Sequence, residues 1–286
     1  MALTTSQQIS RYYEQFESTE VTFTREITLA LLLNTKQVFL KSLGYQWPCI
    51  IYSSSMKGAK VITTMQPSLK ETLQKSKNTV SLRFSFIQPE KNDPLTFFVS
   101  AKIAGISPYG DPKKGLSFLN LVFTQNPPDD LIKRLGTILE AKIASQRRSE
   151  ERIIISPDSA KKIGLTSKGA TVVVDNVPRK ALVRDLSFSG AKIIMPGVAK
   201  FLVNKAVTIS VEFEDPLEIM KLTGTILRFE SVESRPDIAA FAVQFTEGTV
   251  PMAYKMRLTD YFRQIKKKPG SESGPANDAP VESTTG

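Results

Sequence analysis

The sequence predicts a mainly β protein with some helices, built as two β-barrel domains. Three observations lead to this prediction. The chain has 286 residues, which exceeds the roughly 100–200 residues of a typical single domain. Short runs rich in Val, Ile, Thr, Phe and Tyr recur in both halves between turn residues, which is typical of β-strands. Finally, the two halves carry similar motifs in the same order.

The first half is predicted to begin with a helix and to continue mainly as strands. Apolar residues recur at helical spacing in Ser6–Glu17, whereas Val21–Met65 has the composition of β-strands. A short helix that begins with proline is predicted over Pro67–Lys77, and a longer one with acidic residues at its start from Asp129 to about Ala144. The strands predicted between these helices are Val80–Ile87, Leu95–Ile106 and Leu116–Thr124.

The second half is predicted to contain seven strands and a closing helix over about Pro251–Ile265. The strands are Ile153–Ile155, Thr171–Val174, Lys180–Leu186, Ala191–Ile194, Val207–Glu214, Met220–Phe229 and Ile238–Phe245. We therefore expect an N-terminal domain over residues 1–144 and a C-terminal domain over residues 145–265, which begins with an arginine-rich linker over residues 145–152. Residues 266–286 are polar, with almost nothing to bury, and are expected to form a disordered tail.

The halves also match each other in short blocks of sequence. Gly58-Ala59-Lys60 in the first half corresponds to Gly190-Ala191-Lys192 in the second. Val99–Ile103 corresponds to Leu222–Ile226, at a somewhat shorter separation along the chain. We interpret these matches as a duplication of one β-barrel, and the alternative is a chance similarity between two unrelated β domains.

The composition favours binding over catalysis. The chain has no histidine, which excludes a Ser-His-Asp triad, a Cys-His dyad and a zinc site with His ligands. The single cysteine, Cys49, lies in an apolar segment and is expected in a core strand. Catalysis by carboxylates alone stays possible, but no Asp/Glu pair lies in a recognisable motif. We therefore expect neither an enzyme nor a bound cofactor or metal.

The charge of the chain points to an anionic partner. It carries 38 Lys and Arg against 28 Asp and Glu, a net charge of +10, and its pI is about 9.5. Such an excess attracts nucleic acid, nucleotides or a membrane surface, although it also serves plain solubility. No apolar run approaches the ~20 residues needed to span a bilayer, and the first residues lack a signal-peptide pattern. We expect a soluble, cytoplasmic protein.

Three arginines at the junction of the halves form the first motif, Arg147, Arg148 and Arg152. The planar guanidinium group binds phosphate oxygens or the O6 and N7 atoms of guanine with two parallel hydrogen bonds, and it stacks on purines. The alternative is a solvated, charged helix end, since Glu150 and Glu151 lie among these arginines.

The second motif, D-x-S-x-x-G, is formed by Asp185, Ser187 and Gly190. A carboxylate can accept hydrogen bonds from N1–H and the N2 amino group of guanine, and glycine lets the backbone approach a ligand closely. Ser187 and Ser189 alternate with apolar neighbours, which predicts an exposed polar face. The alternative is an ordinary β-turn stabilised by Asp, Ser and Gly.

Together, the two motifs resemble the signature of PilZ domains, the family of cyclic di-GMP receptors, over about residues 145–265. The resemblance rests on R-x-x-x-R at Arg148 and Arg152, the preceding Arg147, and D-x-S-x-x-G at Asp185–Gly190. It implies a six-stranded antiparallel barrel followed by a helix, with the arginine segment wrapped around cyclic di-GMP. An arginine at the position of Arg147 implies an intercalated pair of cyclic di-GMP molecules.

The resemblance implies a bacterial effector that regulates motility, virulence or a related process through a protein partner. Because the arginines lie between the halves, we expect the nucleotide to change the arrangement of the domains. The ligand-binding residues expected on this basis are Arg147, Arg148, Arg152, Asp185, Ser187 and Gly190. The alternative function is that of a basic β-barrel module that binds nucleic acid.

The first half lacks the motif residues. When the halves are aligned on Gly58 and Gly190, Arg148 and Arg152 correspond to Phe16 and Glu20. Asp185 corresponds to Ser53, whereas Ser187 corresponds to Ser55. We therefore expect a PilZ-like barrel that does not bind the nucleotide, comparable with the N-terminal β domain of flagellar-brake proteins.

Overall fold

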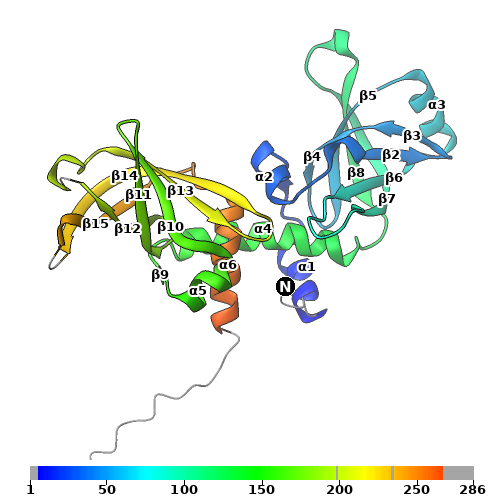
Figure 1. Cartoon of the computed structure of the whole chain (residues 1–286). Coiled ribbons are helices and arrows are strands. Elements are labelled where there is room, and N and C mark those ends of the chain that lie inside the picture. The colour runs from blue at the N-terminus through cyan, green and yellow to red at the C-terminus, as the bar shows by residue number, and fades with distance from the viewer. Residues whose placement is uncertain (1–5, 198, 233–234, 267–286) are drawn as a thin grey trace, which may run out of the picture.

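The computed structural model describes residues 6–197, 199–232 and 235–266, so the predicted tail lies almost entirely outside the described residues. Figure 1 shows two β-sheet domains that are joined by a long helix, α4 (Asp129–Arg147). Each sheet encloses its own hydrophobic core. Within the described ranges, no helix is long and apolar enough to cross a membrane.

The first half forms an eight-stranded sheet in the order β1-β4-β5-β8-β7-β6-β2-β3. β3 and β4 are separated only by Cys49, which is buried in the core as expected. The elements before α4 are α1 (Ser6–Phe16), β1 (Val21–Thr22), α2 (Arg25–Ala30), the 3-10 turn Thr35–Gln37, β2 (Phe39–Ser42), β3 (Tyr45–Pro48), β4 (Ile50–Ser54), β5 (Gly58–Thr64), α3 (Pro67–Lys75), β6 (Thr79–Phe86), β7 (Leu95–Pro108), the 3-10 turn Pro112–Lys114 and β8 (Leu116–Phe123).

The second half forms a closed antiparallel barrel of six strands in the order β10-β13-β14-β15-β12-β11, with β10 also paired to β11 and β9 added at the edge of β11. This confirms the predicted mainly β fold with a closing helix. The elements are β9 (Ile153–Ile154), α5 (Pro157–Ile163), β10 (Leu165–Val174), β11 (Val177–Leu186), β12 (Gly190–Pro196), the 3-10 turn Ala199–Phe201, β13 (Ala206–Phe213), β14 (Glu218–Val232), β15 (Arg235–Phe245) and α6 (Met252–Lys266).

Two short helices, α2 and α5, were not predicted. Thr24 caps α2 by accepting a hydrogen bond from the backbone N–H of Ile27. Ser156 caps α5 in the same way, and Gly164 ends that helix in the left-handed conformation, with φ of 72°. Each helix spans fewer than eight residues, which is too short for a helical repeat of apolar residues to be recognised. Only the capping residues mark these helices in the sequence.

The strand register favours a duplication over chance similarity. β1 pairs with β4 through Val21 and Ser54, and β9 pairs with β11 through Ile153 and Leu186. Ile153 and Leu186 lie as far along the chain from Val21 and Ser54 as Gly190 lies from Gly58. The β2–β3 and β10–β11 hairpins match in the same way, and so do the first residues of α2 and α5. Because β3 and β4 together match β11, the first sheet follows the path of the second barrel.

Gly58 and Gly190 occupy the same place in the two repeats, and neither position has room for a side chain. A Cβ atom on Gly58 would lie 2.3 Å from the carbonyl oxygen of Leu121. A Cβ atom on Gly190 would lie 2.3 Å from the carbonyl oxygen of Val243. Both glycines are therefore required by the close approach of two backbones.

The halves meet through α1, α4 and α6, and Glu140 of α4 is the centre of this contact. Its Oε2 accepts hydrogen bonds from the Tyr12 hydroxyl at 2.5 Å and from Arg263 of α6 at 2.7 Å. Its Oε1 accepts from Arg11 at 3.0 Å. Burial raises the pKa of Tyr12, so its hydroxyl keeps the proton that it donates.

We expect Gly58→Ala to lower the free energy of unfolding by about 3 kcal/mol, because the added methyl group meets backbone rather than a movable side chain. Urea denaturation followed by circular dichroism measures this change. Gly105→Ala is the matched control, since its nearest neighbour is the flexible Asn120 side chain at 3.3 Å. Equal stability of the two variants would contradict the close approach at Gly58.

Candidate ligand-binding site

The three arginines of the first motif follow one another from a helix into a strand. Arg147 is the exposed last residue of α4. Arg148 caps the helix, with its backbone N–H bonded to the carbonyl of Ala144. A turn then brings Arg152 to the start of β9. The arginine segment is thus a direct continuation of α4, held at its far end by a strand.

The structure brings the two motifs into direct contact. Arg152 Nη1 donates a hydrogen bond to Asp185 Oδ1 at 2.6 Å. The pairing of β9 with β11 places them together, because Ile154 lies opposite Asp185. The Asp185 side chain is 11% exposed and that of Arg152 is 41% exposed. A nearly buried carboxylate therefore holds a guanidinium group whose other N–H groups can reach a ligand.

Arg148 faces the closing helix of the second domain. Its guanidinium carbon lies 5.7 Å from the centre of the Phe262 ring of α6. Its Nε lies 3.8 Å from Glu151 Oε1, and the side chain is 25% exposed. The position is thus a cation–π contact at the edge of the site rather than a free surface charge.

Ser187 corrects one expectation, because its side chain is fully buried instead of lying on an exposed polar face. Its hydroxyl accepts from the backbone N–H of Gly190 at 3.0 Å, and its own N–H donates to the Gly190 carbonyl at 2.8 Å. The Tyr254 hydroxyl of α6 donates to the Ser187 carbonyl at 2.8 Å. Burial raises the pKa of Tyr254 and keeps this donor protonated. Ser187 therefore shapes the turn from inside.

Ser189 was not predicted as a site residue, yet it joins the two motifs a second time. Its hydroxyl donates to the Ser149 carbonyl at 2.8 Å and lies 3.1 Å from Glu150 Oε1. Its backbone N–H also donates to the Ser149 carbonyl, at 3.3 Å. The only sequence signal was a second serine inside the D-x-S-x-x-G motif, and the long-range contact gives that serine its role.

The first half uses the same positions with different chemistry. Ser53 donates to Glu20 Oε1 at 2.6 Å, in the place that Asp185 and Arg152 occupy in the second half. Phe16, at the position of Arg148, is buried in the first core. The corresponding surface of the first half therefore presents a carboxylate where the second half presents a cation.

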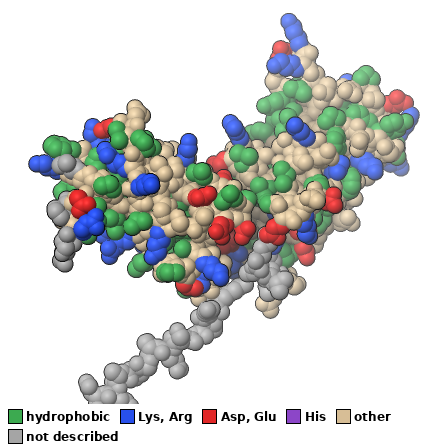
Figure 2. Space-filling model, in the orientation of Figure 1, with side chains coloured by type: hydrophobic (Ala, Val, Ile, Leu, Met, Phe, Trp, Pro, Cys, Tyr) green, Lys and Arg blue, Asp and Glu red, His purple; other side chains and the backbone are tan. Residues whose placement is uncertain are grey.

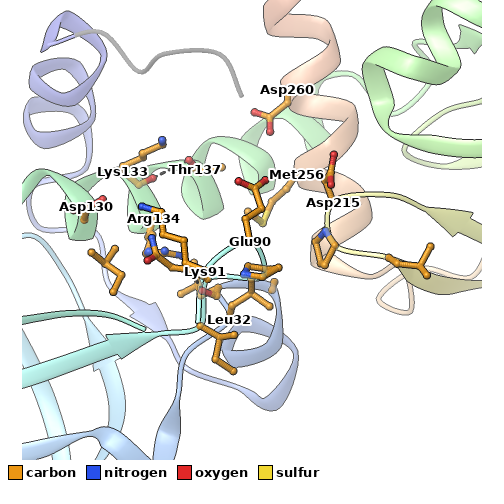
Figure 3. A pocket seen from close by; sticks show the side chains of 18 of the residues that line it. Leu32, Glu90, Lys91, Asp130, Lys133, Arg134, Thr137, Asp215, Met256 and Asp260 are labelled. Carbon is orange, nitrogen blue, oxygen red and sulfur yellow. Dashed lines mark hydrogen bonds between the residues drawn. The ribbon is translucent and has the colours of Figure 1, made fainter. Parts of the chain in front are cut away.

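A separate cavity of about 820 Å³ lies between the halves (Figure 3). Its lining mixes bases such as Lys133 and Arg134 with acids such as Asp130 and Asp260. Burial lowers the pKa of Arg134, whose guanidinium carbon lies 4.2 Å from the centre of the Phe86 ring. Acidic side chains also gather on the visible surface where the halves meet (Figure 2). Four acidic and four basic side chains line this cavity, so its lining offers no net positive charge for an anion.

Two family profiles match the chain, the PilZN3 domain over residues 7–142 and the PilZ domain over residues 146–264. The cyclic di-GMP binding protein of Treponema denticola is 45% identical over 272 residues, which are 95% of this chain and 86% of that protein. Two solved structures are also similar to the chain. The Borreliella burgdorferi PlzA protein in complex with c-di-GMP has 27% identity and a TM-score of 0.41, covering 90% of this chain and 99% of that one. YcgR from Escherichia coli, in complex with c-di-GMP, has 12% identity and a TM-score of 0.29, covering 85% and 88%.

The matched profiles and the relative confirm the resemblance found in the sequence, and they extend it to the first half. The chain therefore belongs to the PilZ family, with a PilZN3 domain ahead of its PilZ domain.

Proposed function

We propose that this protein is a cyclic di-GMP receptor whose nucleotide site lies where the arginine segment meets the turn of β11 and β12. The contact between Arg152 and Asp185 at 2.6 Å carries the proposal, because it places a phosphate-binding group beside a guanine-binding group. The 45% identical relative is named as a cyclic di-GMP binding protein. The site residues proposed are Arg147, Arg148, Arg152, Asp185, Ser187 and Gly190.

Each residue has a role that follows from its place. Arg152 binds a phosphate or the O6 and N7 edge of guanine while Asp185 orients it. Asp185 accepts hydrogen bonds from the N1 and N2 edge. Arg148 covers a base with its flat face, and Arg147 serves a second, intercalated nucleotide. Gly190 lets β12 lie close to β15 beside the site, and Ser187 contributes through the shape of the turn.

We also propose that the nucleotide changes the arrangement of the two domains, residues 1–144 and residues 145–265. A protein partner recognises the new arrangement. α4 supports this part, because Leu131 and Ile138 pack in the first core while its end carries the arginines. A ligand that orders the arginine segment against the second barrel also constrains the end of α4, whose other side chains pack in the first domain. The ligand can shift the arrangement only by its difference in affinity for the two states.

Isothermal titration calorimetry with cyclic di-GMP, GTP and a short oligonucleotide tests the proposal. We expect binding of cyclic di-GMP, and we expect Arg152→Ala to weaken it about thirtyfold, or ~2 kcal/mol, through loss of charge-assisted hydrogen bonds. Arg235→Ala is the matched control, since Arg235 is also an exposed arginine paired with an aspartate. Binding of the oligonucleotide alone, with a steep salt dependence, would favour the nucleic-acid module instead.

The pairing of Arg152 with Asp185 predicts that their substitutions are not additive. We expect Asp185→Ala to weaken binding and Asp185→Asn to be milder, because the amide keeps an acceptor oxygen. In the double variant Arg152→Ala/Asp185→Ala, the combined loss should be smaller than the sum of the single losses. Equal affinity of the wild type for cyclic di-AMP would refute the guanine role of Asp185.

Small-angle X-ray scattering tests the change between domains. We expect a different radius of gyration with saturating cyclic di-GMP at an unchanged oligomeric state, and no such difference in Arg148→Ala. Superimposable curves for the wild type with and without ligand would show that the domains keep one arrangement.

A further inference from the structure

The outer face of the second barrel continues the site beyond its two motifs. Asp185 lies opposite Lys192 on β12, and Lys192 lies opposite Ala242 on β15. Ala242 in turn lies opposite Arg228 on β14. Directly opposed residues of antiparallel strands point to the same face of a sheet. These four residues therefore form one row across the barrel surface, which we call the outer row.

Cations of the outer row and its neighbours cluster around one exposed carboxylate, Glu230. Lys192 Nζ donates to Glu230 Oε2 at 2.6 Å. The Lys192 side chain is 20% exposed, whereas that of Glu230 is 54% exposed. This hydrogen bond lowers the pKa of Glu230, and the charges of Arg228 and Arg184 lower it further. Three cations thus surround a single anion beside the motif site.

Residues with small side chains lie between these cations on the barrel surface. Ala242 separates Lys192 from Arg228, and Ala240 lies opposite Glu230 in the neighbouring row. A phosphate can therefore approach Lys192 without displacing a bulky side chain.

The first repeat provides an internal comparison, because it keeps the lysine but not its surroundings. Lys60 lies opposite Ser53 and Asn120, as Lys192 lies opposite Asp185 and Ala242. Its ammonium lies 5.9 Å from the centre of the Tyr52 ring and 5.5 Å from that of Phe118. The cluster of cations is therefore found in the repeat that also carries the nucleotide motifs.

We propose that the outer row is a second phosphate subsite for cyclic di-GMP, with Lys192 as the phosphate ligand and Glu230 as the counter-ion that the phosphate replaces. This inference rests on the proposed function. Arg152 serves one phosphate of the cyclic dinucleotide, and Lys192 serves the other, with Arg228 adding positive charge. The cations around Glu230 outnumber that carboxylate, which favours a phosphate at Lys192.

Calorimetric titration with cyclic di-GMP at low salt, where such contacts are least screened, tests the subsite with three variants. Lys192→Met removes the charge and keeps the alkyl chain, and we expect at least tenfold weaker binding. Glu230→Gln removes the competing anion and should tighten binding about threefold or more. Lys60→Met, the same substitution in the first repeat, should bind as the wild type does.

Unchanged affinity of a folded Lys192→Met protein would overturn the subsite. Should that variant unfold, Glu230→Gln decides alone, because its exposed side chain tolerates the change and equal or weaker binding contradicts the replacement of Glu230 by phosphate. If either result is obtained and Arg152→Ala still binds cyclic di-GMP more weakly than the wild type, only the subsite is refuted and the proposed receptor function stands. Absence of binding by the wild type would overturn both.

Discussion

Helix α4 has to pack against both halves of the chain, and this constraint sets the position of the candidate site. Leu131, Ile138 and their neighbours fill the first core, while Ala144 packs against the second. Glu140 ties the same helix to α1 and α6. Because the helix ends at Arg147, the arginine segment starts from a fixed point, and the contact between Ser189 and Ser149 fixes it again.

Sequence patterns predict those parts of the fold that depend on neighbours in the chain. The periodicity of Ser6–Glu17 and the acidic start of α4 mark helices, and both motifs of the candidate site are visible as residue types at fixed spacing. The sequence did not reveal the burial of Ser187 or the contact of Ser189 with Ser149. Both depend on residues that lie 40 or more positions away along the chain. Lys192 was missed for a different reason, because strand register rather than sequence spacing places it opposite Asp185.

The duplication separates what the fold requires from what a ligand requires. Gly58 and Gly190 occupy the same crowded position, because two backbones meet there in either repeat. Each half also keeps a contact between its leading segment and the matching strand. In the first half Ser53 of β4 contacts Glu20, and in the second half Asp185 of β11 contacts Arg152. Only the sign and size of the groups differ. A pair that reaches the surface can exchange its charges at little expense to stability, so one repeat could keep the barrel without the cations of the other.

The hydrogen bond from Tyr254 to the carbonyl of Ser187 has a consequence for the order in which the protein is completed during synthesis. The turn beside Asp185 is held from inside by a residue of the last helix, and β12 is paired along its length with β15. A nascent chain that has emerged only as far as β11 already contains the arginines and Asp185, but it lacks the groups that hold them in place. The candidate nucleotide site is therefore completed only when α6 leaves the ribosome, and the same helix adds Met252 to the first core.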